Sequence, residues 1–275
     1  MENCASCSAP LTGPYCAACG EKKITPHDLT VSHFVGHALH DITHFDTKVF
    51  SSLIPLIIKP GFLTAEFMAG RWKAYIKPTT LFVLINLFFF FAHRGVMSWD
   101  ADDYIRATGA NAAKLVEQRA VQRGQTIEVY KEHFTEIAKE RQHLTFFFSI
   151  PVVALTLLIL MRRRLFVEHL VYSIHFHAFA LIWLTVGLQL LFWVILRPLV
   201  WIGLANVVTW LGQEPGLNYL VGVTLGFYHF AAVRRVYRSR WFAAVGIATA
   251  LVLAESVFIV YVFQPLVFYW VYYTA

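Results

Sequence analysis

The sequence predicts an all-α membrane protein with about five transmembrane helices and a small zinc ribbon at its N-terminus. The 275 residues are 57% hydrophobic and only 15% charged, whereas a soluble domain averages about 25% charged residues. Apolar stretches near the length of about 20 residues that a spanning helix needs recur after residue 78. All four cysteines lie among the first nineteen residues, in two CxxC pairs.

The two CxxC pairs predict a structural zinc site with no open coordination position. Cys4 and Cys7 form the first pair, and Cys16 and Cys19 form the second, with a Pro- and Gly-containing link between them. Each CxxC directs two thiolates at one ion, and a short link can fold one pair onto the other. Two disulfides or four free thiols are the alternatives, but disulfides need an oxidising compartment. Because such a short segment buries almost no hydrophobic core, the bound metal would supply its folding energy.

Hydropathy predicts five spans and several segments that do not cross. The spans are residues 78–97, 143–161, 167–196, 217–233 and 241–263, followed by an aromatic FYWVYY tail at the far interface. Residues 47–59 are too short to span and contain Pro55, which predicts an interfacial or half-inserted helix ending at Pro60-Gly61. Residues 62–77 predict a surface connector, and residues 199–216, interrupted by glycines and a proline, predict an interfacial helix on the far side.

These segments divide the chain into three parts. The zinc ribbon covers residues 1–20, a cytoplasmic part with His-rich and interfacial helices covers 21–77, and the membrane domain covers 78–275. Residues 98–142 are charged and predict a helical excursion outside the membrane, with helices over Ala110–Arg123 and Thr126–His143 on either side of Gly124.

The basic residues predict which side of the membrane each end occupies. With the N-terminus inside, fourteen of the 23 Lys and Arg residues lie on inner flanks, and seven of the others are spread through the acidic 98–142 loop. The N-terminus is therefore expected in the cytoplasm of a bacterial cell, below the inner membrane, and the C-terminus outside. The first twenty residues carry cysteines where the apolar core of a signal peptide would lie, so we expect no cleavable signal.

Four of the twelve histidines form a stripe ahead of the first apolar segment. His33, His37, His40 and His44 follow a spacing of four, three and four residues, which places them on one helix face, with Asp41 one turn past His37. Imidazoles four residues apart can share a zinc or iron ion. The alternatives are an amphipathic helix whose polar face happens to use histidine, and a pH sensor.

A second group of ionisable residues begins the third span. Glu168, Tyr172 and His175 fall on one helix face, and His169 and His177 lie to its sides. Ionisable groups at membrane depth are costly and mark a functional site, or they hydrogen-bond between helices. We expect this group and the His33–His44 stripe to meet at the inner membrane face, as a second Zn²⁺ or Fe²⁺ site or a proton-linked gate. Further polar candidates within spans are His229 and Glu255.

The motifs resemble a bacterial family of membrane proteins known as domain of unknown function 3667. The resemblance is carried by the CxxC…YCxxCG ribbon, by LIIKPGFLTAEFMAGRWKAYIKPTTLF and by EHLVYSIHFHAF, and it covers most of the chain except residues 98–142. It implies a topology and no activity. In span count alone the chain is also similar to Yip1-type five-span proteins, which have a cytoplasmic N-terminal region and act as membrane adaptors.

The common catalytic motifs are absent from the sequence. It contains no Walker A loop, GxGxxG, GxSxG or HExxH, and its histidines do not match the HxxHH boxes of membrane desaturases. The expected function is a membrane adaptor, or a channel or transporter for small solutes or lipids, with the ribbon docking a cytoplasmic protein. The alternative is a membrane metalloenzyme or metal transporter that uses both histidine groups. The net charge is +6, and the basic residues cluster beside apolar segments, which favours the lipid bilayer over nucleic acid as the partner. The sequence is also compatible with an oligomer.

Overall fold

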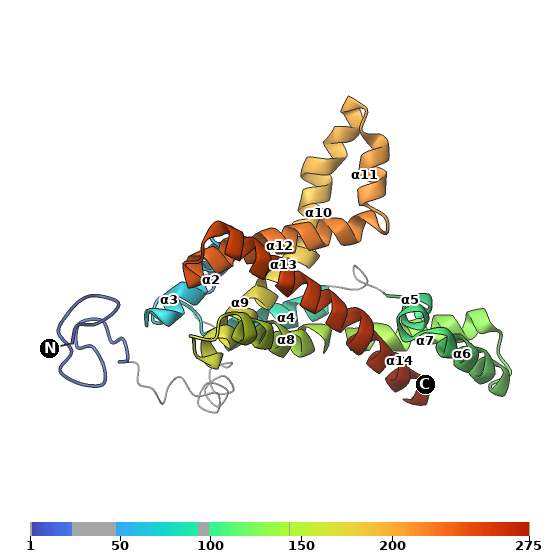
Figure 1. Cartoon of the computed structure of the whole chain (residues 1–275), viewed down its shortest axis with the longest axis horizontal. Coiled ribbons are helices and arrows are strands. Elements are labelled where there is room, and N and C mark those ends of the chain that lie inside the picture. Colours follow the sequence, from blue (N-terminus) through green and yellow to red (C-terminus); the bar gives the residue numbers. More distant parts are fainter. Residues whose placement is uncertain (1, 24–47, 93–98, 143, 275) are drawn as a thin grey trace. The chain divides into compact units, whose positions relative to one another are not determined.

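The computed structural model describes residues 2–23, 48–92, 99–142 and 144–274, and their secondary structure is helical except for two isolated β-bridges near the N-terminus. The predicted all-α class is therefore confirmed. The chain divides into two compact units: residues 1–92 with 154–252, and residues 93–153 with 253–275. Figure 1 labels the helices and colours them along the sequence. Helices α8 (Leu144–Leu160) and α13 (Trp241–Phe258) contribute residues to both units.

The first unit is built around one long helical run. Its segments are α9 (Phe166–Ile182), a π-helical turn (Trp183–Gly187), α10 (Leu188–Leu190), a second π-helical stretch (Leu191–Leu196) and a 3-10 helix (Arg197–Ile202). Before this run come α2 (Lys48–Ile58), α3 (Phe62–Met68) and α4 (Pro78–Ala92), and after it α11 (Ala205–Leu211) and α12 (Gly216–Tyr237). Helix α9 packs most extensively against α4 and also contacts α2 and α3, so thirteen of its residues are buried.

A glycine turn joins α2 to α3 and lets them approach α12. Gly61 has a φ of 73°, a conformation that favours glycine. A Cβ atom at this position would lie 2.8 Å from the backbone of Ala232 in α12. Beside the turn, the Arg235 guanidinium donates to the Pro60 carbonyl at 2.7 Å, and the Tyr228 hydroxyl donates to the Leu56 carbonyl at 3.0 Å. The turn therefore fixes the segment around α2 and α3 onto α12.

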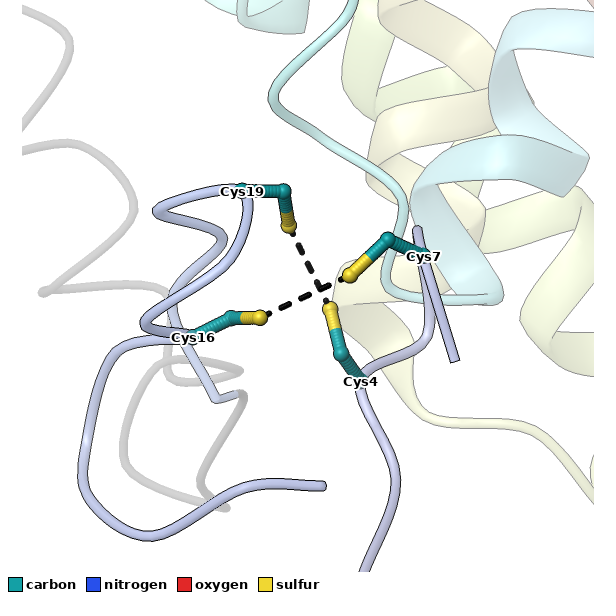
Figure 2. Close-up of side chains that lie close together, drawn as sticks. All are labelled: Cys4, Cys7, Cys16 and Cys19. Atoms are coloured by element: carbon teal, nitrogen blue, oxygen red, sulfur yellow. Dashed lines mark hydrogen bonds between the residues drawn. The ribbon is translucent and has the colours of Figure 1, made fainter. Parts of the chain in front are cut away.

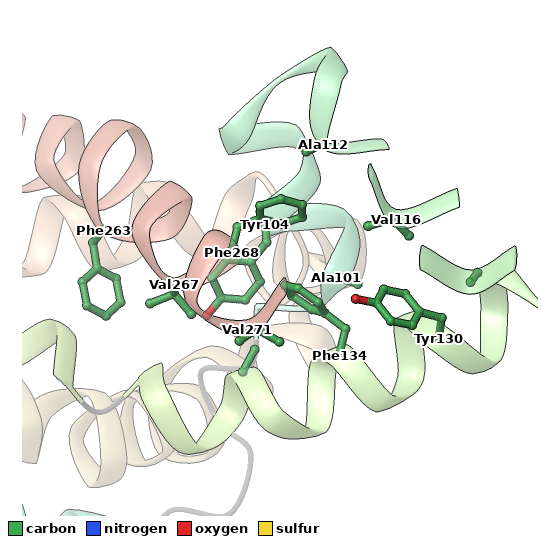
Figure 3. Close-up of a cluster of buried hydrophobic side chains, with 12 residues drawn as sticks. Ala101, Tyr104, Ala112, Val116, Tyr130, Phe134, Phe263, Val267, Phe268 and Val271 are labelled. Atoms are coloured by element: carbon green, nitrogen blue, oxygen red, sulfur yellow. The ribbon is translucent and has the colours of Figure 1, made fainter. Parts of the chain in front are cut away.

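The second unit is a cluster of short helices around an aromatic core. It contains α5 (Ala101–Thr108), α6 (Ala110–Gln122) and α7 (Ile127–Gln142), and the C-terminal helix α14 (Gln264–Thr274) packs against α5 and α7. Figure 3 shows Tyr104, Phe134 and Phe268 gathered in this core, and all three are buried. Burial raises the pKa of Tyr104. The two helices predicted within residues 98–142 are confirmed as α6 and α7, with α5 preceding them.

The C-terminal aromatic segment differs from the expectation of an interfacial tail. Beyond the predicted end of the fifth span at residue 263, the chain stays helical to Thr274, and Phe268 and Val271 are buried in the second unit. Arg119 donates to the Tyr272 carbonyl at 3.0 Å, close to the C-terminus of α14. Residues 263, 267, 268 and 271 follow a helical period, so one face of α14 is buried while Tyr273 remains exposed. The π-helical turn Ile259–Phe263 precedes Pro265, which cannot donate to an α-helical ladder.

Among the residues that the structure describes, three helices are long and apolar enough to cross a membrane, or up to five if each bent helix pair counts as one span. The three are Phe166–Ile202, Gly216–Tyr237 and Trp241–Thr274. The bent pairs are α2 with α3, at 117°, and α7 with α8, at 50°. The apolar part of α4 is shorter, Pro78–Phe90. The chain is thus a multi-span membrane protein that contacts the lipid bilayer.

Two helices continue beyond the predicted span ends. The third helical run does not end at Arg197-Pro198 but continues to Ile202 and ends at Gly203, whose φ is 89°. Pro198 is tolerated because it falls in the first turn of the 3-10 segment. The fourth helix runs past residue 233 to Tyr237, because Arg234 and Arg235 in its last turn interact favourably with the helix dipole. Residues 199–216 contain the end of the 3-10 helix, α11 and the turn before α12, rather than one helix.

Candidate metal centre and buried histidine pairs

The two CxxC segments fold as matching knuckles. In the first, the Ser8 N–H donates to the Cys4 carbonyl at 2.9 Å, and in the second the Gly20 N–H donates to the Cys16 carbonyl at 2.7 Å. Ser8 and Gly20 each follow the second cysteine of a pair, and both have a positive φ, of 61° and 71°. An isolated β-bridge encloses each knuckle, Asn3 with Pro10 and Tyr15 with Lys22. The same local sequence spacing therefore produces the same turn twice.

The knuckles bring the four cysteine sulfurs together. Figure 2 shows the four side chains pointing at one another. The Sγ atoms of Cys4 and Cys19 are 3.5 Å apart, as are those of Cys7 and Cys16, and all four lie within 4.8 Å of one another. Tetrahedral Zn–S bonds of about 2.3 Å place sulfurs about 3.8 Å apart, whereas a disulfide needs about 2.05 Å. The four thiols are free, and their arrangement suits a closed zinc site.

The electrostatics of the cluster favour one thiolate, that of Cys16. The backbone N–H of Cys19 lowers the pKa of the Cys16 thiol to about 6, whereas the neighbouring sulfurs raise the pKa of the Cys7 and Cys19 thiols. A thiolate is the form of cysteine that binds a metal, and zinc replaces the remaining thiol protons when it binds. Because four sulfurs fill a tetrahedral site, an ion held there has no position for substrate, and its chemistry is structural.

A buried carboxylate connects the ribbon to the segment between α3 and α4. The Glu21 Oε2 atom accepts a hydrogen bond from the Ser6 hydroxyl at 2.8 Å and another from the Lys73 backbone N–H at 3.0 Å. Glu21 is only 6% exposed. A hydrogen bond to a buried charged group is stronger than one between neutral groups. The metal-binding fold and residues 69–77 therefore share one anchoring side chain.

The predicted His33–His44 stripe lies outside the described residues. This concerns His33, His37, His40, Asp41 and His44, which fall within residues 24–47. The meeting of this stripe with the α9 group therefore stays a prediction. Among the described residues, the four cysteines are the one group of three or more His, Cys, Asp or Glu side chains close enough to hold an ion.

The histidines of α9 are buried, and each has its own oxygen partner. His169 Nδ1 lies 2.8 Å from the Tyr237 hydroxyl of α12, and His175 Nδ1 lies 3.0 Å from the Thr64 hydroxyl of α3. His177 Nδ1 lies 2.8 Å from the Ser173 carbonyl one turn earlier in the same helix. The first two imidazoles join α9 to its neighbours, and the third bonds within α9.

The other polar candidates divide between the bundle and the helix ends. The Tyr172 hydroxyl lies 2.9 Å from His229 Nδ1, and the His229 ring stacks on Phe176 at 3.8 Å between centroids. Glu168 lies in the first turn of α9, where Oε2 accepts from the Leu165 N–H at 3.1 Å and Oε1 lies 3.3 Å from Arg164. It is therefore a helix-terminal group, with partners in the turn before α9. Glu255 is half-buried in α13.

Sequence reasoning missed three members of this group: Thr64, Tyr228 and Tyr237. Thr64 and His175 are 111 residues apart, and His169 and Tyr237 are 68 apart. The nearest sequence signal was the pair His229 and Tyr237, which are eight residues apart and so lie on the same face of one helix. That spacing does not say which helix faces them.

These observations define a multi-span helical membrane protein with a four-cysteine cluster suited to zinc. A model of the family described as "Protein of unknown function (DUF3667)" matches residues 46–90, which include α2, α3 and most of α4. The resemblance to this family is therefore confirmed over that segment. No curated protein and no solved structure matches the chain significantly.

Proposed function

We propose that this protein is a membrane adaptor whose zinc ribbon docks a cytoplasmic protein partner. The observation that carries the proposal is the Glu21 carboxylate, which binds the ribbon through Ser6 and the segment before α4 through Lys73. A closed four-cysteine site builds a rigid surface and performs no chemistry of its own. A docking surface fixed to a membrane bundle is the arrangement that an adaptor requires.

The proposal includes a location and an orientation. The N-terminus lies in the cytoplasm and the C-terminus outside the inner membrane of a bacterial cell, with residues 98–142 as an excursion on the outer side. The basic flanks around Arg162–Arg164 and Arg234–Arg240 support this orientation, as do the free thiols, which suit a reducing compartment. The three-part division at residues 20 and 77 belongs to the same proposal.

A photo-crosslinking experiment tests the docking role. A photoreactive residue would replace Tyr15, which is 60% exposed on the ribbon, in the otherwise intact chain in living cells. We expect one cytoplasmic protein to be cross-linked, and the same product to disappear when Cys4 and Cys19 are replaced by serine. The matched control places the photoreactive residue at Tyr219, an exposed residue of α12. Equal products from Tyr15 with and without the cysteines would contradict the proposal.

Reporter fusions test the orientation separately. A periplasmic reporter fused after Ala275 is expected to be active and a cytoplasmic reporter inactive, because an odd number of spans separates the two ends. The opposite pattern would place both ends on one side.

The second candidate is a membrane metalloenzyme or metal transporter. It is favoured by the buried imidazoles of His169, His175 and His229, which lie in the same unit as the ribbon. Metal content distinguishes the candidates: one zinc per chain supports the adaptor. A further zinc or iron that is lost in a His175→Gln variant supports the metal-dependent function.

A further inference from the structure

A small recess lies where α3, the segment before α4 and the buried face of α9 meet. Its apolar wall is formed by Leu63, Phe67 and Ile76, and His175 is part of the lining. All the other lining residues fall within the family-matched segment 46–90. The inner space of the recess is about 20 Å³, which is enough for one water-sized group.

The rim of the recess carries cations and amphipathic rings. Arg71, Trp72, Tyr75 and Lys77 line it. The Arg71 side chain is held in place because Nε donates to Glu66 Oε2 at 2.7 Å and Nη2 donates to the other carboxylate oxygen. The Nε–H and one N–H of Nη2 face Glu66, so both N–H groups of Nη1 and the second N–H of Nη2 can donate to a ligand. The salt bridge raises the pKa of Arg71, which keeps the guanidinium charged.

The rings of the rim are fixed by their own contacts. Trp72 stacks on Phe67 with centroids 4.3 Å apart and donates its indole N–H to the Phe67 carbonyl at 2.5 Å. Tyr75 packs edge-on against Phe62 at 5.9 Å. Trp and Tyr rings at such positions are typical of the boundary between headgroups and hydrocarbon.

The recess also lies at the end of an apolar helix. Pro78 is the first residue of α4, which contains no charged residue through Ala92. Lys77 is exposed directly before it. A change from Arg and Lys to an uncharged helix is what the edge of a bilayer produces, so the rim stands at the level of lipid phosphates.

We infer that this recess binds the phosphate of an anionic lipid headgroup. One phosphate oxygen fits the inner space beside His175, and the remaining oxygens face Arg71 and Lys77, with Trp72 and Tyr75 beside the glycerol. Arginine and lysine are the usual partners of phosphate oxygens, and each basic residue near the surface strengthens binding to anionic lipid. The inference uses the membrane placement of the proposed function and is independent of what the ribbon docks.

Native mass spectrometry of the zinc-loaded full chain in an uncharged detergent tests the inference. Phosphatidylglycerol, diacylglycerol with the same tails, and inorganic phosphate would be titrated separately. We expect phosphatidylglycerol to bind, diacylglycerol not to bind, and inorganic phosphate to bind only weakly. A Lys77→Glu variant should bind phosphatidylglycerol about tenfold more weakly. The matched control is Lys114→Glu, which makes the same change at an exposed position of α6, outside the recess and the predicted spans, and should leave binding unchanged.

Three outcomes would overturn the inference. Equal binding of diacylglycerol would show recognition of the tails, and inorganic phosphate binding without phosphatidylglycerol would assign the recess to the free anion. An equal loss in the Lys77→Glu and Lys114→Glu variants would show that the effect comes from net charge alone. The second variant, Tyr75→Leu, keeps every charge and is expected to weaken phosphatidylglycerol binding with no loss of zinc. The reporter fusions do not depend on this recess, so they test the proposed membrane orientation independently of lipid binding.

Discussion

The ribbon and the α9 bundle both collect side chains that can bind metals, and they do so in opposite ways. In the ribbon, four sulfurs from two short turns converge within 4.8 Å. In the bundle, His169 and His175 point to different neighbours, the Tyr237 and Thr64 hydroxyls. The directions of these side chains have two different causes. Short spacing within one turn sets where the ribbon ligands point, whereas the packing of distant helices sets where the bundle imidazoles point. The ribbon is expected to respond to mutation as one unit, and the bundle pairs independently.

The largest expected effect is the loss of the ribbon fold when ligands are removed. A Cys4→Ser/Cys19→Ser variant should lose its zinc entirely, because two remaining thiolates cannot complete the site. Structural zinc contributes about 10–16 kcal/mol of apparent binding free energy in small zinc domains, so residues 2–23 should become protease-sensitive while the spans stay inserted. Elemental analysis and limited proteolysis measure both. The control is Ala5→Ser in the same knuckle, and one retained zinc per chain in the double variant would refute the site.

The bundle should respond most strongly at the turn between α2 and α3. A Gly61→Ala change combines a positive φ with a 2.8 Å approach to the Ala232 backbone. We expect a loss of about 2–4 kcal/mol in the free energy of unfolding, from backbone strain and overpacking together. Denaturant unfolding in detergent measures it, with zinc content unchanged.

The matched control for this variant is Gly222→Ala in α12. A Cβ at Gly222 meets nothing within 4 Å, so alanine should leave stability unchanged or raise it slightly. If Gly61→Ala were as stable as Gly222→Ala, the close packing of the turn on α12 would be wrong.

The fold was predictable where the signal is local and was missed where it depends on neighbours. The CxxC spacing was enough to predict the sulfur cluster, and hydropathy was enough to predict an all-helical membrane chain. The helix ends at Arg197 and Arg234 were misplaced because a proline and a pair of arginines are compatible with continuing a helix. The C-terminal helix was predicted to be an interfacial tail because the local sequence does not show what it packs against. Its buried face packs on helices more than 120 residues earlier in the chain. Thr64 and Tyr237, the partners of His175 and His169, could not be predicted, because local sequence spacing does not show which helices pack together.

A moderate effect is expected from single hydroxyls in the bundle. Thr64→Val and Tyr237→Phe each remove one partner of a buried imidazole and should each cost about 1 kcal/mol, as interhelical hydrogen bonds in membranes do. Because the two pairs are separate, the double variant should lose the sum within about 0.5 kcal/mol. Thermal unfolding in detergent measures these values, with Tyr219→Phe, an exposed tyrosine, as the control. A double variant no less stable than the singles would show that the imidazoles act as one site.

The smallest expected effect lies in the ribbon, at the position where its two knuckles differ. Ser8 and Gly20 occupy equivalent places with φ values of 61° and 71°, but only the second is a glycine. A non-glycine residue in this conformation costs about 1 kcal/mol, so Ser8→Gly should remove that strain and tighten zinc binding by about two- to fivefold. A chelator competition with the intact chain measures the change. Gly13→Ala, where a Cβ meets nothing within 4 Å, serves as the control in the link between the knuckles. Weaker zinc binding by Ser8→Gly would mean that the serine side chain supports its knuckle, and the two turns would not be equivalent.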